Sequence, residues 1–243
     1  AFAHQSGTTG GLRGGDGGMA SRSIIAETGG VEAANRSRGP RAALPAPGMP
    51  PQPLDGNQKT MNLIWQEFLA ANGARIDGQL VTDFGDPAAE WAAAEAGTIV
   101  APLTHLALIE VAGPDAETFL HNQLTSDVRH LAHDAIQHSA WCSAKGRMLA
   151  SFLVFRSGPD YHLQLSADLL PTIQKRLQMF VLRSQVVVAE RSANCELIGL
   201  SGPQAANALL TAGLPVPGRV LTTAAFDSGI VLRSEEHTSE LQS

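Results

Sequence analysis

Residues Val111–Phe155 read VAGPDAETFLHNQLTSDVRHLAHDAIQHSAWCSAKGRMLASFLVF, and this stretch decides the fold of the chain. An apolar run ends just before Gly113-Pro114, a pair that predicts a tight turn. Asp115 is then placed to cap a helix. Three apolar residues share one face of that helix: Phe119, Leu120 and Leu124. A second apolar run closes the stretch, which therefore predicts strand, turn, helix, polar loop and second strand.

Two polar clusters lie at the ends of these predicted elements. The first follows the helix and consists of Gln123, Thr125, Ser126 and Asp127. The second precedes the closing strand and consists of Cys142, Ser143, Lys145, Gly146 and Arg147. Because apolar elements hold polar groups at fixed positions, the clusters predict a binding site at the edge of a sheet.

The candidate site residues each have a functional and a structural interpretation. Asp127 is suited to accept hydrogen bonds from the amino or ring N–H groups of a heterocycle, or else to cap a turn. Lys145 and Arg147 are suited to hold an anionic tail such as a glutamate chain, or else to be solvated charges. Cys142 is a candidate reactive thiol, or else a small residue packed at the start of a strand.

Four histidines raise the question of a metal site: His121, His130, His133 and His138. They lack the HExxH spacing, and no cysteine lies within a few residues of more than one of them. The sequence therefore predicts solvated histidines and no metal. It also contains no GxSxG, P-loop or GxGxxG motif.

Composition indicates a globular chain of 243 residues with 44% hydrophobic residues and a net charge of −6. No run of basic residues favours nucleic-acid binding, and no apolar run approaches the length that spans a bilayer. Two cysteines without CxxC spacing, Cys142 and Cys195, predict neither a disulfide framework nor zinc. We expect a soluble protein in a reducing compartment.

The two ends differ in composition from the middle. Residues 1–60 are rich in glycine and proline without hydrophobic periodicity, which predicts disorder, and Met61 is a candidate natural start. The alternative for this segment is a mitochondrial transit peptide, which its acidic residues disfavour. Residues 233–243, RSEEHTSELQS, resemble a translated sequencing adapter, so the domain is expected to span residues 61–232 and to be incomplete.

The remaining pattern predicts an α+β domain with a mixed or antiparallel sheet. Predicted helices lie within 61–71 and 169–183, a hairpin within 76–84, and strands within 106–111, 148–155, 161–165 and 186–188. The glycine-proline turn at Gly113 recurs 89 residues later at Gly202, again before an Ala/Leu-rich helix. This echo predicts two related strand-turn-helix units.

Two segments carry a family resemblance: GPDAETFLHNQLTSDV at Gly113–Val128 and WCSAKGRMLASFLVF at Trp141–Phe155. A third segment, LQMFVLRSQVVV at Leu177–Val188, matches the family's helix-to-strand passage. In these segments the chain resembles the YgfZ-type folate-binding proteins, relatives of the aminomethyltransferase of the glycine cleavage system. The resemblance covers residues 102–200 closely and residues 61–101 more loosely.

This resemblance implies an aminomethyltransferase-like folate-binding domain with flanking helices, truncated before its C-terminal part. The implied ligand is tetrahydrofolate or a one-carbon derivative, and no catalytic residue is assigned. The candidate ligand-binding residues are Gln123, Thr125, Asp127, Cys142, Lys145 and Arg147. The implied role is that of an accessory protein in the assembly or repair of iron-sulfur enzymes, with an indirect effect on tRNA modification.

The expected partners are folate and iron-sulfur client enzymes, without direct binding of nucleic acid or membrane. The expected compartment is the cytoplasm of a bacterium, or the mitochondrial matrix of a eukaryote.

The sequence departs from the family pattern at two places. The Lys-Gly-Cys-x-x-Gly-Gln-Glu motif of the YgfZ-type proteins is absent. Where the aminomethyltransferase carries an Asp-Asp pair, this chain has Ala150 and Ser151, which cannot accept a proton as a carboxylate does. Aminomethyl transfer is therefore the second hypothesis, and a structural or interaction fragment without ligand binding is the third.

Overall fold

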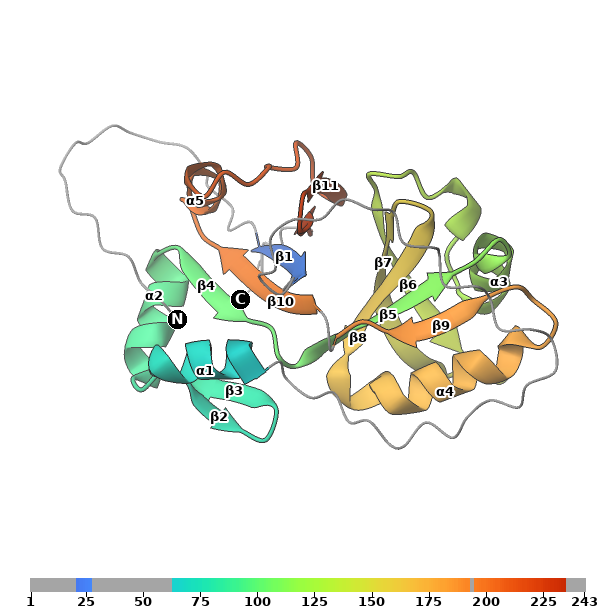
Figure 1. The fold of residues 1–243 in the computed structure, drawn as a ribbon, viewed down its shortest axis with the longest axis horizontal. Helices are drawn as coiled ribbons and strands as arrows, with labels where there is room; N and C mark the ends of the chain where they lie inside the picture. The colour runs from blue at the N-terminus through green and yellow to red at the C-terminus, as the bar shows by residue number, and fades with distance from the viewer. Residues whose placement is uncertain (1–20, 28–62, 193–194, 235–243) are drawn as a thin grey trace, which may run out of the picture.

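The structure is a computed structural model that describes residues 21–27, 63–192 and 195–234 (Figure 1). Two five-stranded sheets dominate it, and the strand pairings in them are antiparallel throughout the described residues. The α+β expectation is therefore confirmed, in its antiparallel form. None of the helices in these ranges is long and apolar enough to cross a membrane.

The first sheet has the order β6-β7-β8-β5-β9 and contains most of the Val111–Phe155 stretch. Its strands are β5 (Leu106–Ala112), β6 (Ile136–Cys142), β7 (Met148–Ser157), β8 (Asp160–Ser166) and β9 (Val187–Glu190). Two helices contribute to the core on one of its faces, α3 (Ala116–Gln123) and α4 (Leu170–Val181). Short 3₁₀ turns, η1 (Val128–His130) and η2 (Ala167–Leu169), complete this half.

The second sheet has the order β11-β12-β1-β10-β4. Its strands are β1 (Ser21–Glu27), β4 (Ile99–Pro102), β10 (Cys195–Ser201), β11 (Thr222–Phe226) and β12 (Gly229–Arg233). Helix α5 (Ala205–Thr211) follows β10. A smaller unit precedes β4 and comprises α1 (Leu63–Ala71), the hairpin β2 (Arg75–Asp77) and β3 (Leu80–Asp83), and α2 (Pro87–Ala96).

A hydrophobic cluster joins the two sheets. Leu108 and Phe155 project from the first sheet, and Leu197 and Leu232 project from the second, all nearly inaccessible to solvent. The opposite face of the first sheet packs against α3 and α4 through a separate and larger core. Strands β5 and β8 and residues 152–155 of β7 are therefore covered on both faces. The apolar run of β7 predicts this for the whole strand, but Met148 and Ser151 are exposed.

Two glycine turns confirm the predicted echo. Gly113 ends β5 and Gly202 ends β10, with φ of 118° and 115°, and each precedes a helix. A Cβ on Gly113 would collide with the backbone oxygen of Gln185, and one on Gly202 with that of Gly97. Only glycine combines this conformation with such a close backbone approach.

The capping prediction for Asp115 is correct in position but wrong in partner. Asp115 occupies the N-cap of α3, yet its side chain accepts no hydrogen bond from that helix. Its Oδ2 instead accepts a 2.8 Å hydrogen bond from the backbone N–H of Gln185. Asp115 therefore joins the start of α3 to the loop before β9.

The structure corrects several sequence predictions. Strand β8 was predicted to bury one face, but His162 and Gln164 on the other face are 9% and 4% exposed, because the second sheet covers them. Strands β4, β6 and β11 were not predicted, since their sequences mix polar, proline and alanine residues. The predicted α1 is present, but among its apolar residues only Leu69 is buried.

The terminal predictions are only partly within the described residues. Ser21–Glu27 forms β1, so the expectation of no regular structure in residues 1–60 is wrong for these seven residues, because backbone pairing needs no side-chain period. The rest of that segment lies outside the described residues. Of the predicted adapter segment, Arg233 ends β12, whereas residues 235–243 lie outside the description.

Replacing Gly113 or Gly202 with alanine is expected to lower the free energy of unfolding by about 2–3 kcal/mol, through strain and backbone collision. Gly158→Ala is the matched control, because Gly158 also has a positive φ but open space around it. That control is expected to cost about 1 kcal/mol. Urea denaturation measures all three, and equal losses would contradict the role of close approach.

Candidate functional site

The candidate site lies on the face of the first sheet that points toward the second sheet, here called the inter-sheet face. Strand register defines it: Phe155 pairs with His162, Leu153 pairs with Gln164, and Glu110 pairs with His162 from the other side. Since side chains alternate along strands, Ser151 shares this face with Leu153. Polar side chains here lie beside the hydrophobic cluster that joins the two sheets.

Three charged or titratable groups meet on the inter-sheet face. Arg191 Nε donates a 2.8 Å hydrogen bond to Glu110 Oε2, and His162 Nε2 lies 3.6 Å from the same oxygen. The His162 ring also stacks on Phe155, with ring centroids 5.2 Å apart. The guanidinium of Arg191 compensates the charge of this partly buried carboxylate.

Burial lowers the pKa of His162 to about 4, and the positive charge of Arg191 adds to this effect, while Asp160 opposes it. His162 is therefore neutral at pH 7. We assign its N–H to Nε2, which faces the Glu110 carboxylate, and this leaves Nδ1 as a hydrogen-bond acceptor.

Two buried atoms on this face have no hydrogen-bond partner: His162 Nδ1 and Gln164 Oε1. Gln164 Oε1 is an acceptor, and His162 Nδ1 is one in the tautomer assigned above; they come from alternate residues of β8 that point the same way. A buried polar atom without a partner costs about 1–3 kcal/mol, so such atoms call for an explanation. An N–H or O–H donor that reaches them, from ordered water or from a ligand, would satisfy both.

Ala150 and Ser151, where the family resemblance implies an Asp-Asp pair in the aminomethyltransferase, lie in β7. Ala150 pairs with Trp141 and is 3% exposed, so it points into the core on the helix side. Ser151 pairs with Ala140 and is exposed, on the same face as Leu153. The chain thus has a hydroxyl, not a carboxylate, at the exposed position of the pair.

The linker after α3 runs along the outer edge of β6, which is the edge strand of the first sheet. Thr125 exchanges two hydrogen bonds with Ala140: its N–H donates to the carbonyl at 2.9 Å, and its Oγ1 accepts from the N–H at 3.0 Å. The hydroxyl groups of Ser126 and Ser139 lie 2.7 Å apart, and Gln137 donates to Ser126 at 3.0 Å. The geometry gives Thr125 a structural role in pairing.

Asp127 lies at the far end of this linker. Its Oδ2 accepts a 2.7 Å hydrogen bond from His130 Nδ1, and its Oδ1 accepts one of 3.1 Å from the N–H of Arg129. The bond from His130 is the main cause that lowers the pKa of Asp127, and the Arg129 N–H contributes. Asp127 therefore caps η1, the turn role that the sequence had left open.

The second polar cluster lies at the other end of the β6 edge. Cys142 ends β6 and is half-buried, whereas Lys145 and Arg147 are exposed in the β6–β7 turn and make no ion pair within residues 63–192. Gln123 is nearer to this end, because Leu124 bridges to Trp141. The structure therefore groups Gln123 with Cys142 and the turn, and it separates them from Asp127.

Gln123 also lines a groove of about 350 Å³ between α3 and the end of α4. The other lining residues are Asp115, Thr118, Phe119, Asn122, Phe180 and Ser184. Phe180 makes an edge-to-face contact with Trp141, which connects the groove wall to β6.

The histidines form no group suited to a metal within the described ranges. His121 Nδ1 lies 3.2 Å from Asp127 Oδ1 without hydrogen-bond geometry, and His130 bonds the other carboxylate oxygen. His121 and His130 thus both lie beside the carboxylate of Asp127, which caps the η1 turn.

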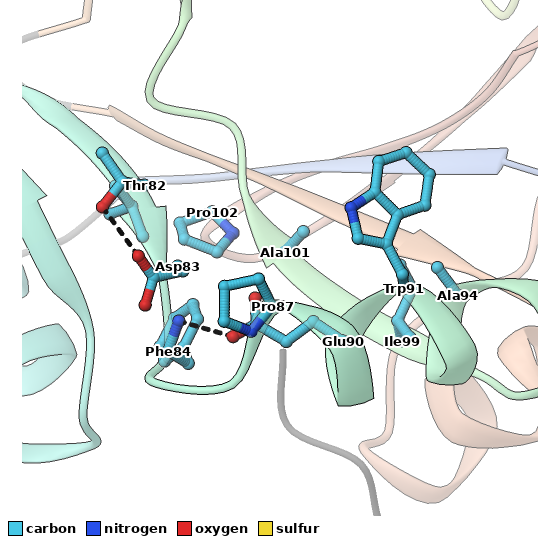
Figure 2. Close-up of a pocket in the computed structure, with 11 residues that line it drawn as sticks. Thr82, Asp83, Phe84, Pro87, Glu90, Trp91, Ala94, Ile99, Ala101 and Pro102 are labelled. Carbon is cyan, nitrogen blue, oxygen red and sulfur yellow. Dashed lines mark hydrogen bonds between the residues drawn. The ribbon is translucent and has the colours of Figure 1, made fainter.

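A second cavity, of about 300 Å³, lies among the β2–β3 hairpin, α2 and β4 (Figure 2). Its carboxylates have structural partners: Glu90 accepts a 2.7 Å hydrogen bond from the N–H of Phe84, and Asp83 pairs with Arg75 at 3.2 Å. In Figure 2 the Trp91 ring stands away from Asp83 and Phe84. The first contact ties the end of the hairpin to α2, and the second joins β2 to β3, so we regard this cavity as the weaker candidate.

Sequence reasoning missed Glu110, His162, Gln164 and Arg191. In β8 the polar residues alternate with apolar ones, a pattern typical of a strand with one solvated face. One signal was available in the sequence: His162 and Gln164 lie in the strand that follows the mainly apolar β7, and they pair with Phe155 and Leu153. It becomes informative only once the second sheet is known to cover that face.

Comparison with known proteins gives concordant results. The family model of the GCVT N-terminal domain matches residues 81–214. A Haemophilus influenzae protein is 39% identical over 101 residues, which are 41% of this chain and 35% of that protein. The tRNA-modifying protein YgfZ of Klebsiella pneumoniae is 33% identical over 111 residues, 45% of this chain and 34% of that protein. The chain thus spans about a third of the length of these curated relatives.

One solved structure resembles the fold. The glycine cleavage system aminomethyltransferase T of Bartonella henselae matches with a TM-score of 0.61 and 21% identity, covering 70% of this chain and 52% of that one. This likeness supports the aminomethyltransferase-like fold.

Protonation of His162 is expected to make stability depend on pH. The unfolded chain binds this proton near pH 6.5 and the folded chain only near pH 4, so stability falls as pH drops through that interval. Wild type should lose about 3 kcal/mol more than His162→Gln between pH 7 and pH 4. Urea unfolding at stepped pH measures this, and parallel curves would show that His162 titrates normally in the folded state.

Proposed function

Because the chain belongs to the family of the GCVT N-terminal domain, we propose that it is a folate-binding, YgfZ-like accessory protein and that it binds tetrahydrofolate or a one-carbon derivative. One observation carries the proposal: two buried acceptors without partners, His162 Nδ1 and Gln164 Oε1, share the inter-sheet face. A pterin presents ring N–H and amino donors, which are the groups that these acceptors lack.

The polar turn at the end of this face suits the rest of the ligand. Leu153, which pairs with Gln164, lies six positions after Arg147, and this spans about 20 Å in an extended strand. Lys145 and Arg147 are exposed and cationic, so they are suited to the carboxylates of a glutamate tail. Gln123 and Cys142 lie at the same end and are proposed to contact this tail, whereas Thr125 and Asp127 are proposed to shape the edge.

The position of Ser151 favours binding over transfer chemistry. A carboxylate at this exposed position would lie on the same face as the proposed ligand and could act on a folate nitrogen. Ser151 has no such proton acceptor, and Ala150 points into the other core. We therefore place aminomethyl transfer second, although the fold resembles that of an aminomethyltransferase.

The cellular role follows from the similarity to YgfZ-type proteins. We propose support for the assembly or repair of iron-sulfur enzymes in the cytoplasm, with tRNA modification affected through such an enzyme. The net charge of −6 supports an indirect effect, because direct binding of tRNA relies on positive charge.

Isothermal titration with tetrahydrofolate tests the ligand and its place. Wild type should release or absorb heat at saturable stoichiometry, and Gln164→Leu should weaken binding about tenfold by removing one hydrogen bond while keeping the volume filled. Gln204→Leu, at an exposed glutamine that precedes α5, is the matched control and should change affinity less than threefold. Unchanged affinity in Gln164→Leu would exclude the inter-sheet face as the pterin site, and no binding by wild type would refute folate binding.

An aminomethyltransferase assay tests the reaction. With an aminomethylated lipoyl carrier and tetrahydrofolate, the chain is expected to form no methylene-tetrahydrofolate above background, since the exposed position of the pair holds Ser151. A glycine cleavage aminomethyltransferase run in parallel shows that the carrier is competent. Sustained turnover by this chain would favour the second hypothesis.

A further inference from the structure

The two five-stranded sheets are copies of one plan. Their strand orders are β6-β7-β8-β5-β9 and β11-β12-β1-β10-β4. Each strand of one sheet has a counterpart at the same position of the other, and all the pairings are antiparallel. In both, a hairpin forms one edge, and the second hairpin strand pairs with a central strand. The glycine turns after β5 and β10 match as well, since Gly113 approaches the chain leading into β9 and Gly202 approaches the chain leading into β4.

Strands β8 and β1 hold the same place but reach it differently. Strand β8 follows β7 through a tight hairpin in which Ser157 pairs with Asp160. Strand β1 instead comes from far upstream in the chain and inserts between β12 and β10. It makes seven residue pairs with β10 and five with β12.

Without β1, two neighbouring strands would lose their partners on the same side. The backbone N–H and C=O groups of β10 and β12 would then form two facing strand edges, and such edges bind extended segments through main-chain hydrogen bonds. Leu197 on β10 and Leu232 on β12 belong to the cluster that joins the sheets, so the two strands that flank the gap also carry part of the inter-sheet contact.

We propose that the gap between β10 and β12 is a strand-acceptor site, and that Ser21–Glu27 fills it by strand complementation. The site takes an extended segment antiparallel to both neighbours and holds it by backbone pairing. Because the fit rests on backbone pairing with β10 and β12, we expect the strand to bind also when it is supplied as a separate peptide.

Hydrogen exchange on the full chain tests the site. Ile24→Pro removes a backbone donor and bends β1, so exchange at β10 and β12 amides should rise at least tenfold. The β5, β7 and β8 amides form the internal control and should change less than threefold. The peptide SRSIIAE, added at saturation, should restore protection in β10 and β12, whereas the same peptide with proline at the first isoleucine should not. Ile24→Val is the matched substitution control and should exchange like wild type.

A second measurement covers the case in which Ile24→Pro unfolds both sheets. A specific protease site inserted between residues 28 and 62 allows the link to be cut in the folded wild-type chain. The amino-terminal fragment should then co-elute with the remainder in gel filtration and separate only in denaturant. Dissociation of the fragment, unchanged exchange in Ile24→Pro, or lost protection that the peptide does not restore would each overturn the proposal. A dimer that requires Ser21–Glu27 would also overturn it, because a second copy would then supply the strand.

Discussion

The packing of one sheet on the other is the constraint on which the site depends. Leu108 and Phe155 meet Leu197 and Leu232, and this contact removes water from the face of β8 that would otherwise be solvated. Desolvation then lowers the pKa of His162 and leaves two acceptors without partners. The face of β8 that carries His162 and Gln164 looks solvated from its sequence, but in the fold it is buried.

The polar groups at the β6 edge and those on the inter-sheet face have different roles. The sheet edge formed by β6 uses its hydroxyl groups and Asp127 to hold the linker after α3, so these residues define the shape of the first sheet. The inter-sheet face retains unsatisfied acceptors, which is where a ligand gains most from hydrogen bonding. Ser151 lies on this same face, nearer to the cationic turn than Leu153, and it places a hydroxyl instead of a carboxylate there.

Features that depend on neighbouring residues could be predicted from the sequence, whereas features that depend on distant strands could not. The turn at Gly113, the helix after it and the repeat at Gly202 depend on neighbours in sequence, and all three are present. Edge strand β6 was not predicted, because its polar residues pair with a linker instead of facing solvent. Burial of Gln164 was also missed, since the residues that cover it belong to strands about 30 and 70 positions farther along the chain.

The sequence by itself determined the strand-turn-helix units, the family resemblance and the absence of a carboxylate pair at Ala150 and Ser151, because these reside in residue identity and short spacing. Only the tertiary structure decided which polar residues share a desolvated face. Alternation along a strand assigns His162 and Gln164 to one side, but it does not reveal whether water or another sheet lies there. The second sheet supplies that answer, and the proposed ligand site follows from it.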